Sequence, residues 1–214
     1  MTSTTSSEVA AAARALIVAC RHLAGAGLSP GGSGNVSVRT GDVVVVTPTG
    51  SSLSRVVADD LAVVSGDQVV GGRAPSKELP LHRACYAARG DVHAVVHLHS
   101  PYAVAASCLP ALASPPATGP LPALTPYQVM RLGALPVVPY APPGSRELAD
   151  RVAALAAHHD AMLLANHGPV VAASSLSAAL DLAEELEAAA RLYFLLIGVP
   201  HHGLTQDQVD GLRG

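Results

Sequence analysis

Short valine-rich segments joined by tight glycine turns constrain the fold of this chain more than any other feature. Residues 36–39 and 43–46 flank a Gly-Asp turn at 41–42, and a second apolar pair surrounds the Gly-Asp turn at 66–67. Two apolar runs separated by such a turn are typical of a β-hairpin, in which the strands are antiparallel. These hairpins favour an antiparallel or mixed sheet over a doubly wound parallel one.

Helical patterns alternate with the expected strands and indicate a mixed α/β chain. Thr5-x-x-Glu8 matches a capping box and predicts a helix that runs to about Ala24. Ser76 is a favourable N-cap for a second helix that reaches about Ala88. The other expected elements are helices over 145–157 and 175–197, strands over 95–99, 136–140, 161–165 and 170–173, and a long proline-rich loop over 109–125.

The composition argues against several classes of function. Only 14% of the residues are charged, against about 25% in an average soluble domain, so other subunits are expected to cover part of the exterior. The net charge of −3, the single Phe and the lack of Trp offer nucleic acid neither a basic face nor stacking platforms. Every apolar stretch is shorter than the roughly 20 residues that span a bilayer, so no membrane partner is expected.

The N-terminus and the cysteines bear on domain organisation and compartment. Residues 1–7 lack a basic or hydrophobic segment that would direct export, and we expect a flexible segment there, followed by one domain over residues 8–214. The cysteines lack the CxxC spacing of a metal or redox site, which favours reduced thiols and a cytoplasmic location. They are Cys20, Cys85 and Cys108.

A pair of alternating histidines is the strongest local signal for chemistry. His97 and His99 lie in the expected strand 95–99, and alternate residues of a strand point to the same face. Their imidazoles can therefore share a cation, since imidazole is a common zinc ligand. Two unrelated histidines at a strand end would show the same spacing, so the pair alone leaves both interpretations open. His93 has the same parity but is expected to precede the strand.

A metal site needs further ligands, and three residues are candidates. His167 lies in Asn-His-Gly-Pro, a polar break between two aliphatic strands. Glu78 lies in the first turn of the expected helix, where the helix dipole stabilises a carboxylate without any metal. His82 lies four residues later on the same helical face, so a Glu78–His82 pair is a competing ligand set.

Three polar turns could together bind an anion. Asn35 follows a glycine-rich loop, Thr49 and Gly50 follow an apolar strand, and Ser76 and Lys77 begin a helix. Backbone N–H groups, hydroxyl groups and a positive charge are what a bound phosphate requires. Each turn is ordinary by itself, so the prediction depends on the three meeting in the fold.

Taken together, these motifs resemble the class II aldolase/adducin family. The resemblance covers residues 9–197 and implies a single-domain three-layer α/β/α sandwich with a largely antiparallel central sheet. It also implies a homotetramer whose active sites lie between neighbouring subunits. The motifs that carry it, in this order and separation, are Ser-Gly-Asn35-Val-Ser, Thr-Pro-Thr49-Gly50, Pro-Ser76-Lys77-Glu78, Val-Val-His97-Leu-His99 and Asn-His167-Gly.

The resemblance also implies roles for individual residues. The family's metal ligands fall on His97, His99 and His167, with one divalent ion per subunit, zinc being the usual metal and Mn, Co or Mg the alternatives. In the L-fuculose-phosphate aldolase branch, the residue matching Glu78 is both a metal ligand and the acid/base. Tyr127 falls near a tyrosine that this branch lends to the neighbouring active site, where it could protonate or orient an oxygen. The phosphate site of that branch maps onto Asn35, Thr49, Gly50, Ser76 and the position of Lys77.

Two positions narrow the resemblance. The epimerase branch has Asp where this chain has Glu78, and the aldolase branch has Ser where it has Lys77. With Leu-Thr-Pro-Tyr127 and Leu-Ala-Asn-His167-Gly-Pro-Val, the motifs look most like the 3-oxo-tetronate 4-phosphate decarboxylases. That implies loss of CO2 to give dihydroxyacetone phosphate through a metal-bound enediolate. The alternatives are an aldolase that cleaves a sugar phosphate, and a non-catalytic adducin-like assembly module.

Overall fold

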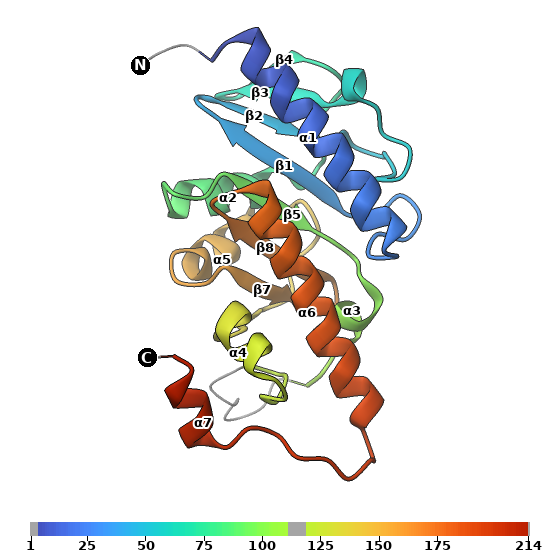
Figure 1. Ribbon diagram of the computed structural model, residues 1–214. Coiled ribbons are helices and arrows are strands. Elements are labelled where there is room, and N and C mark those ends of the chain that lie inside the picture. The colour runs from blue at the N-terminus through green and yellow to red at the C-terminus, as the bar shows by residue number, and fades with distance from the viewer. Residues whose placement is uncertain (1–3, 111–118, 214) are drawn as a thin grey trace.

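The structure of the protein, a computed structural model, describes residues 4–110 and 119–213 (Figure 1). Part of the expected loop over 109–125 and the first three residues of the segment 1–7 lie outside the described residues. Within the described part, the first helix already includes Ser6 and Ser7. Thr5 and Glu8 form the expected capping box, with the Glu8 carboxylate 2.7 Å from the backbone N–H of Thr5.

One sheet of eight strands runs through the molecule in the order β4-β3-β2-β1-β5-β8-β7-β6. Every neighbouring pair is antiparallel except β6 and β7, so the predicted, largely antiparallel sheet is confirmed. Both Gly-Asp hairpins form, and Gly41 and Gly66 adopt the positive φ that such turns require. The strands are β1 Asn35–Thr40, β2 Val43–Val46, β3 Ala62–Ser65, β4 Gln68–Gly71, β5 Ala94–His97, β6 Val137–Val138, β7 Ala161–Leu164 and β8 Gly168–Ala173.

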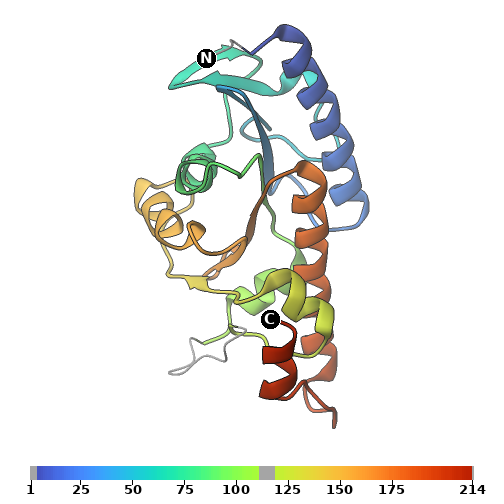
Figure 2. The same cartoon turned by 60° about the vertical axis from the view of Figure 1, so that its left-hand side comes forward.

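Helices cover both faces of the sheet and confirm the three-layer sandwich (Figure 2). One face carries α1 Ser6–Gly25, α3 Pro101–Ser107, α4 Pro126–Leu132 and α6 Leu176–Leu196; the other carries α2 Leu79–Ala88 and α5 Arg146–Ala156. A short helix η1, Ala58–Asp60, precedes β3, and α7, Gln206–Gly211, lies near the C-terminus. The sequence did not predict α4 or α7. None of the described helices is long and apolar enough to cross a membrane.

Alternation along β5 divides the core into two layers. Val96 packs with Leu16 of α1 and Leu186 of α6 on one face, whereas Val95 packs with Leu81 of α2 on the other. Each fully buried aliphatic side chain contributes about 1.5–3 kcal/mol relative to an exposed one. His97 has the parity of Val95, so the strand directs its imidazole toward the layer of α2 and α5.

Among the predicted boundaries that the structure corrects, two concern Glu78 and His99. Strand β5 ends at His97, so His99 lies just beyond the strand and not within it. Helix α2 begins at Leu79, and Glu78 rather than Ser76 occupies the N-cap position. Pro80, the second helical residue, has no N–H for the Glu78 side chain to accept from, and the N–H of the third, Leu81, donates to the Glu78 backbone carbonyl at 3.0 Å. The Glu78 carboxylate is thereby free for other partners.

Candidate metal centre

Four side chains from three parts of the chain converge on one point. Glu78 precedes α2, His97 ends β5, His99 follows two residues later, and His167 lies in the turn between β7 and β8. Their ligand atoms all lie within 4.8 Å of one another. The structure therefore brings together the ligand set that the family resemblance implied.

The separations between these atoms are short and uniform. Nε2 of His97 lies 3.3 Å from Nε2 of His99 and 3.3 Å from Nε2 of His167. The Glu78 carboxylate reaches two of the rings, with Oε2 3.4 Å from His97 Nε2 and Oε1 3.4 Å from His167 Nε2. Ligands about 2.1 Å from a tetrahedral zinc ion would lie about 3.4 Å apart. The residues thus fit the cation that their types indicate.

The charge states of these groups also suit a metal. Burial, and then the charge of His97, lowers the pKa of His99 and of His167, the latter to about 4. Burial alone would raise the pKa of Glu78, but hydrogen bonding and charge from His97, with a hydrogen bond from Asn35, hold that pKa well below its usual range. Neutral imidazole and ionised carboxylate are the forms that bind metal.

Two further observations support a ligand role for these residues. Nδ1 of His97 lies 2.8 Å from the carbonyl oxygen of Pro169. Donation to that oxygen leaves Nε2 with its lone pair directed at the centre, as in many metal-binding histidines. Oε1 of Glu78 is buried and has no hydrogen-bond partner among the described residues. An ionised oxygen left in this way calls for a partner such as a cation.

The turn that carries His167 depends on an unusual backbone. Asn166 has a φ of 55°, in the left-handed region that asparagine tolerates better than most residues. Gly168 approaches the backbone so closely that a Cβ there would lie 2.4 Å from the carbonyl oxygen of Leu98. Ser107 accepts a hydrogen bond from the His167 N–H at 3.2 Å. These contacts fix the turn in which His167 faces the centre.

The remaining histidines do not join the centre. His82 was a competing ligand, but both of its ring nitrogens bond to other side chains: Nε2 to Asn35 and Nδ1 to Ser37. His93 is exposed at the other end of β5. Of the other histidines, His159 is half-buried and the rest are exposed: His22, His158, His201 and His202.

The three predicted anion-binding turns meet beside the metal centre. The N–H of Ser76 donates to the carbonyl of Thr47 at 3.1 Å, and the N–H of Thr47 donates to the carbonyl of Val36 at 3.0 Å. The segments 35–36, 47–50 and 74–77 are therefore neighbours. The sequence predicts an anion site only if these turns meet in the fold, and they do.

Within this region the candidate residues differ in exposure. Thr49, Gly50 and Lys77 are exposed, whereas Asn35 and Ser76 are buried. The Asn35 amide donates to Oε2 of Glu78 at 2.9 Å, so its side chain faces the metal centre. Lys77 directly precedes Glu78 in the chain, and its charge adds to burial and to the charge of His97 in lowering the pKa of His99 and His167.

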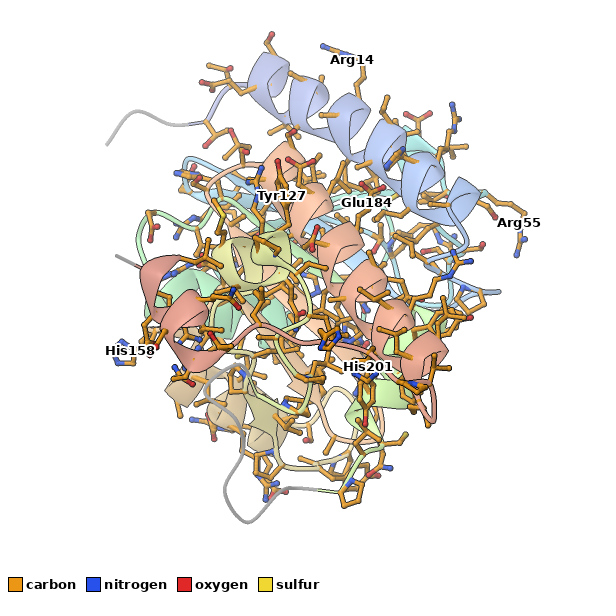
Figure 3. All side chains as sticks on the ribbon, turned by 60° about the horizontal axis from the view of Figure 1, so that its bottom comes forward. Arg14, Arg55, Tyr127, His158, Glu184 and His201 are labelled. Carbon is orange, nitrogen blue, oxygen red and sulfur yellow. The ribbon has the colours of Figure 1, made fainter. Side chains whose placement is uncertain are left out.

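Tyr127 lies on the other side of the sheet from the metal centre of its own chain. Helix α4 packs against α6, opposite α2 and the imidazole of His97. The Tyr127 side chain is 65% exposed and, like Glu184, lines a surface pocket beside α6 (Figure 3). A role in catalysis by Tyr127 would therefore require the site of another subunit.

Sequence reasoning missed two groups that support the centre. Ser37 and Tyr86 continue the contacts of His82, and their alignment depends on how α2 lies over β1, which no short-range pattern predicts. Glu187, on α6, accepts hydrogen bonds from the backbone N–H groups of Tyr102 and Ala103. The only signal for Glu187 is its place within an acidic stretch, and that pattern more often marks a solvated helix face.

The fold and the site together define the chain as a member of the class II aldolase and adducin family. The family described as Class II Aldolase and Adducin N-terminal domain matches residues 14–194.

Individual relatives refine this assignment. The 3-oxo-tetronate 4-phosphate decarboxylase of Haemophilus influenzae is 45% identical over 189 residues, which cover 87% of this chain and 89% of the relative. The L-fuculose phosphate aldolase of Escherichia coli O6:H1 is 35% identical over 190 residues, covering 87% and 84%. The crystal structure of YgbL from Klebsiella pneumoniae has a TM-score of 0.88 and 40% identity, covering 96% of this chain and 99% of that one.

Proposed function

We propose that the protein is a metal-dependent carbon–carbon lyase that decarboxylates a 3-oxo-tetronate 4-phosphate to dihydroxyacetone phosphate and CO2. The observation that carries the proposal is the Glu78, His97, His99 and His167 cluster beside three polar turns that end at Lys77. The similarity of the chain to the 3-oxo-tetronate 4-phosphate decarboxylase of Haemophilus influenzae, over most of both chains, supports the substrate class.

The proposed substrate has a ketone at C3, one carbon removed from its carboxylate. Breaking the C1–C2 bond releases CO2 and leaves the bonding electron pair on C2, where it delocalises onto the C3 oxygen as an enediolate. A divalent cation held by the three imidazoles and Glu78 would stabilise that negative charge as a Lewis acid. A proton added at C2 completes dihydroxyacetone phosphate.

We assign the proton transfer at C2 to Glu78. Its Oε1 lies against His167 without a hydrogen-bond partner in the described structure, whereas Oε2 is bonded to Asn35. Decarboxylation of a carboxylate consumes one proton, which Glu78 would take from solvent and deliver to carbon. General acid–base catalysis of this kind contributes about 10²–10⁴-fold in rate.

We assign Lys77 and the backbone around Thr49, Gly50 and Ser76 to the substrate phosphate, with Asn35 at the inner end of this site. Tight pairing of Lys77 with the substrate carboxylate would stabilise the ground state more than the charge-dispersed transition state, and so would slow the reaction. Pairing with the phosphate has no such cost, because the phosphate keeps its charge throughout. Lys77 should therefore govern substrate binding more than turnover.

The active enzyme is proposed to be a homotetramer with shared sites. Tyr127 could reach a metal centre only in a neighbouring subunit, since it lies across the sheet from its own. Exposed apolar side chains lie on the helix that carries it, near the end of α6 and just beyond that end, and their burial between subunits would be favourable. They include Met130, Leu195, Ile197 and Val199. Light scattering and kinetics on one sample test this, and a fully active monomer would rule it out.

The second candidate is cleavage of a sugar phosphate by an L-fuculose-phosphate-type aldolase. The 35% identity to that aldolase favours it, and the reaction reaches the same enediolate by releasing an aldehyde instead of CO2. A non-catalytic adducin-like assembly module is the least supported alternative, because the chain keeps all four ligands, which the adducin branch lacks.

Product analysis separates these functions. The metal-loaded protein should release CO2 and form dihydroxyacetone phosphate from either the D- or the L-configured 3-oxo-tetronate 4-phosphate, and should not cleave L-fuculose 1-phosphate at a comparable rate. Cleavage of the sugar phosphate without CO2 release from either acid would establish the aldolase. Inactivity on all three substrates, with no bound metal, would favour the assembly module.

A further inference from the structure

A chain of buried polar side chains leads from Glu78 into the layer between α2 and the sheet. Asn35 Nδ2 lies 2.9 Å from Glu78 Oε2, and Asn35 Oδ1 lies 2.5 Å from His82 Nε2. Ser37 Oγ then lies 2.7 Å from His82 Nδ1 and 2.7 Å from the hydroxyl of Tyr86. All five residues are buried, His82 and Ser37 completely.

The ionised carboxylate determines the direction of every bond in this chain. Glu78 can only accept, so Asn35 must turn its NH2 group toward it and its oxygen toward His82. That oxygen also only accepts, so the proton of His82 must be on Nε2. Nδ1 of the neutral ring is then an acceptor for the Ser37 hydroxyl, and Ser37 in turn accepts from Tyr86.

Glu78 and His82 both distinguish the two ends of the Asn35 amide, Glu78 at the NH2 group and His82 at the oxygen. If the amide turned over, its oxygen would face the Glu78 carboxylate and its NH2 group would face the N–H of His82, with no hydrogen bond at either end. In the opposite tautomer of His82, Nε2 would be an acceptor and would favour the reversed amide. Complete burial and then the charge of His97 lower the pKa of His82 to about 3, so the ring stays neutral near pH 7.

We propose that His82 is a positioning residue: its Nε2–H holds the Asn35 amide so that Nδ2 binds Oε2 of Glu78, leaving Oε1 as the free oxygen that faces the imidazoles. The inference rests on the proposed role of Glu78 in proton transfer and extends it to the residues that orient this carboxylate. It also explains why a histidine at ligand-like spacing from Glu78 lies outside the metal centre. On the far side of the ring, the Ser37 hydroxyl, bonded in turn to Tyr86, supplies the donor that Nδ1 needs in this tautomer.

The tautomer can be measured without substrate. In the zinc-loaded protein with isotope-labelled histidine, nitrogen–proton couplings should show His82 neutral, with its proton on Nε2, and His82→Gln should identify its signals by their loss. A proton on Nδ1 of His82 would overturn the inference. This result stands whether or not the protein decarboxylates the proposed substrate, so the inference and the proposed function can fail separately.

Variants test what the tautomer does. Removing an outer-shell partner of a metal site typically costs about 10–100-fold, so we expect His82→Leu to lower kcat by about that factor, with KM and bound metal nearly unchanged. His82→Gln should recover most of the loss, because its side-chain amide can still donate to Asn35. Cys85→Ala is the matched control, since Cys85 is buried on the same helix outside the hydrogen-bond chain.

The inference fails if kcat of His82→Leu falls no further than that of Cys85→Ala when both have lost the same stability. Failure of His82→Gln to recover activity while it folds and binds zinc would also overturn it. If His82→Leu does not fold, His82→Gln and the tautomer measurement on the wild-type protein still decide the question.

Discussion

Two buried glutamates lie on opposite faces of the sheet and have opposite uses. Glu187, on α6, is 8% exposed, and its two carboxylate oxygens accept the backbone N–H groups of Tyr102 and Ala103 at 3.0 and 2.8 Å. Glu78 is 5% exposed, yet one of its oxygens has no hydrogen-bond partner in the described structure. The two side chains are therefore almost equally buried, and they differ in the hydrogen-bond partners of their carboxylate oxygens.

Glu187 is buried to hold two helices together, whereas Glu78 is buried at the candidate metal centre. Glu187 binds the N-terminus of α3, where the N-cap residue Ser100 makes no side-chain cap, and so ties α6 to the segment that follows His99. A carboxylate in this position stabilises a helix through charge and hydrogen bonding. Glu78 instead faces three imidazoles, and the donor atoms of this arrangement suit a bound cation.

The largest expected effect is loss of turnover in Glu78→Gln. If Glu78 carries the proton, the variant should keep its metal and lose about 10²–10⁴-fold in kcat, and its melting temperature should show that it is folded at the assay temperature. Metal analysis, calorimetry and kinetics on one preparation measure all three. Full activity in the metal-loaded variant would rule out Glu78 as the acid/base. Loss of metal in proportion to activity would show that Glu78 serves only as a metal ligand.

Glu187→Ala should give the opposite result. Losing the carboxylate leaves two N–H groups at the start of α3 without their acceptor, which should lower the free energy of unfolding by about 2–3 kcal/mol. Turnover per folded molecule should stay within a few-fold of wild type at a temperature where the variant is folded. Denaturant unfolding followed by kinetics checks this, and a large fall in kcat with unchanged stability would contradict the structural role.

Lys77→Met tests the charge beside Glu78. Removing the proposed phosphate partner should raise KM for the phosphorylated substrate about tenfold or more with little change in kcat, and should weaken inhibition by inorganic phosphate. Arg14→Met, at an exposed cation on α1, is the matched control and should change neither. A collapse of kcat at constant KM would instead place Lys77 in the chemical step.

The last expected effect is a pH dependence of stability to which the buried His82 contributes. The pKa of His82 is lowered to about 3 in the folded protein, so between roughly pH 6.5 and 3 the unfolded chain binds more protons. Stability of the metal-free protein should therefore fall as pH falls, by up to about 1.4 kcal/mol per pH unit from this group. The lowered pKa of Glu78 acts in the same direction below its usual range.

Unfolding at several pH values should show this slope, reduced in His82→Gln and unchanged in His158→Gln, which alters an exposed histidine. Equal slopes in all three proteins would show that His82 does not carry the effect.

The sequence predicted most of the architecture, because hairpin turns and apolar alternation are local signals. It placed the start of α2 wrongly, because Ser76 is a favourable N-cap residue by type. That Glu78 takes the N-cap position, with its carboxylate facing the histidines, is evident only from the folded structure. For the metal centre, strand parity suggested His97 and His99, although His99 lies beyond the strand. The residues alone could not choose between His82 and His167, because that choice depends on how α2 and the β7–β8 turn lie across the sheet.

The most direct test of this account is to locate the metal by anomalous diffraction from crystals of the zinc-loaded protein. We predict one ion per chain, bound by His97, His99 and His167 at nitrogen–metal distances of about 2.1 Å. Glu78 should be bound to the ion or displaced by substrate, and Asn35 should still contact Oε2. An ion bound by His82 or His93 instead, or none at the four-residue cluster, would contradict the account.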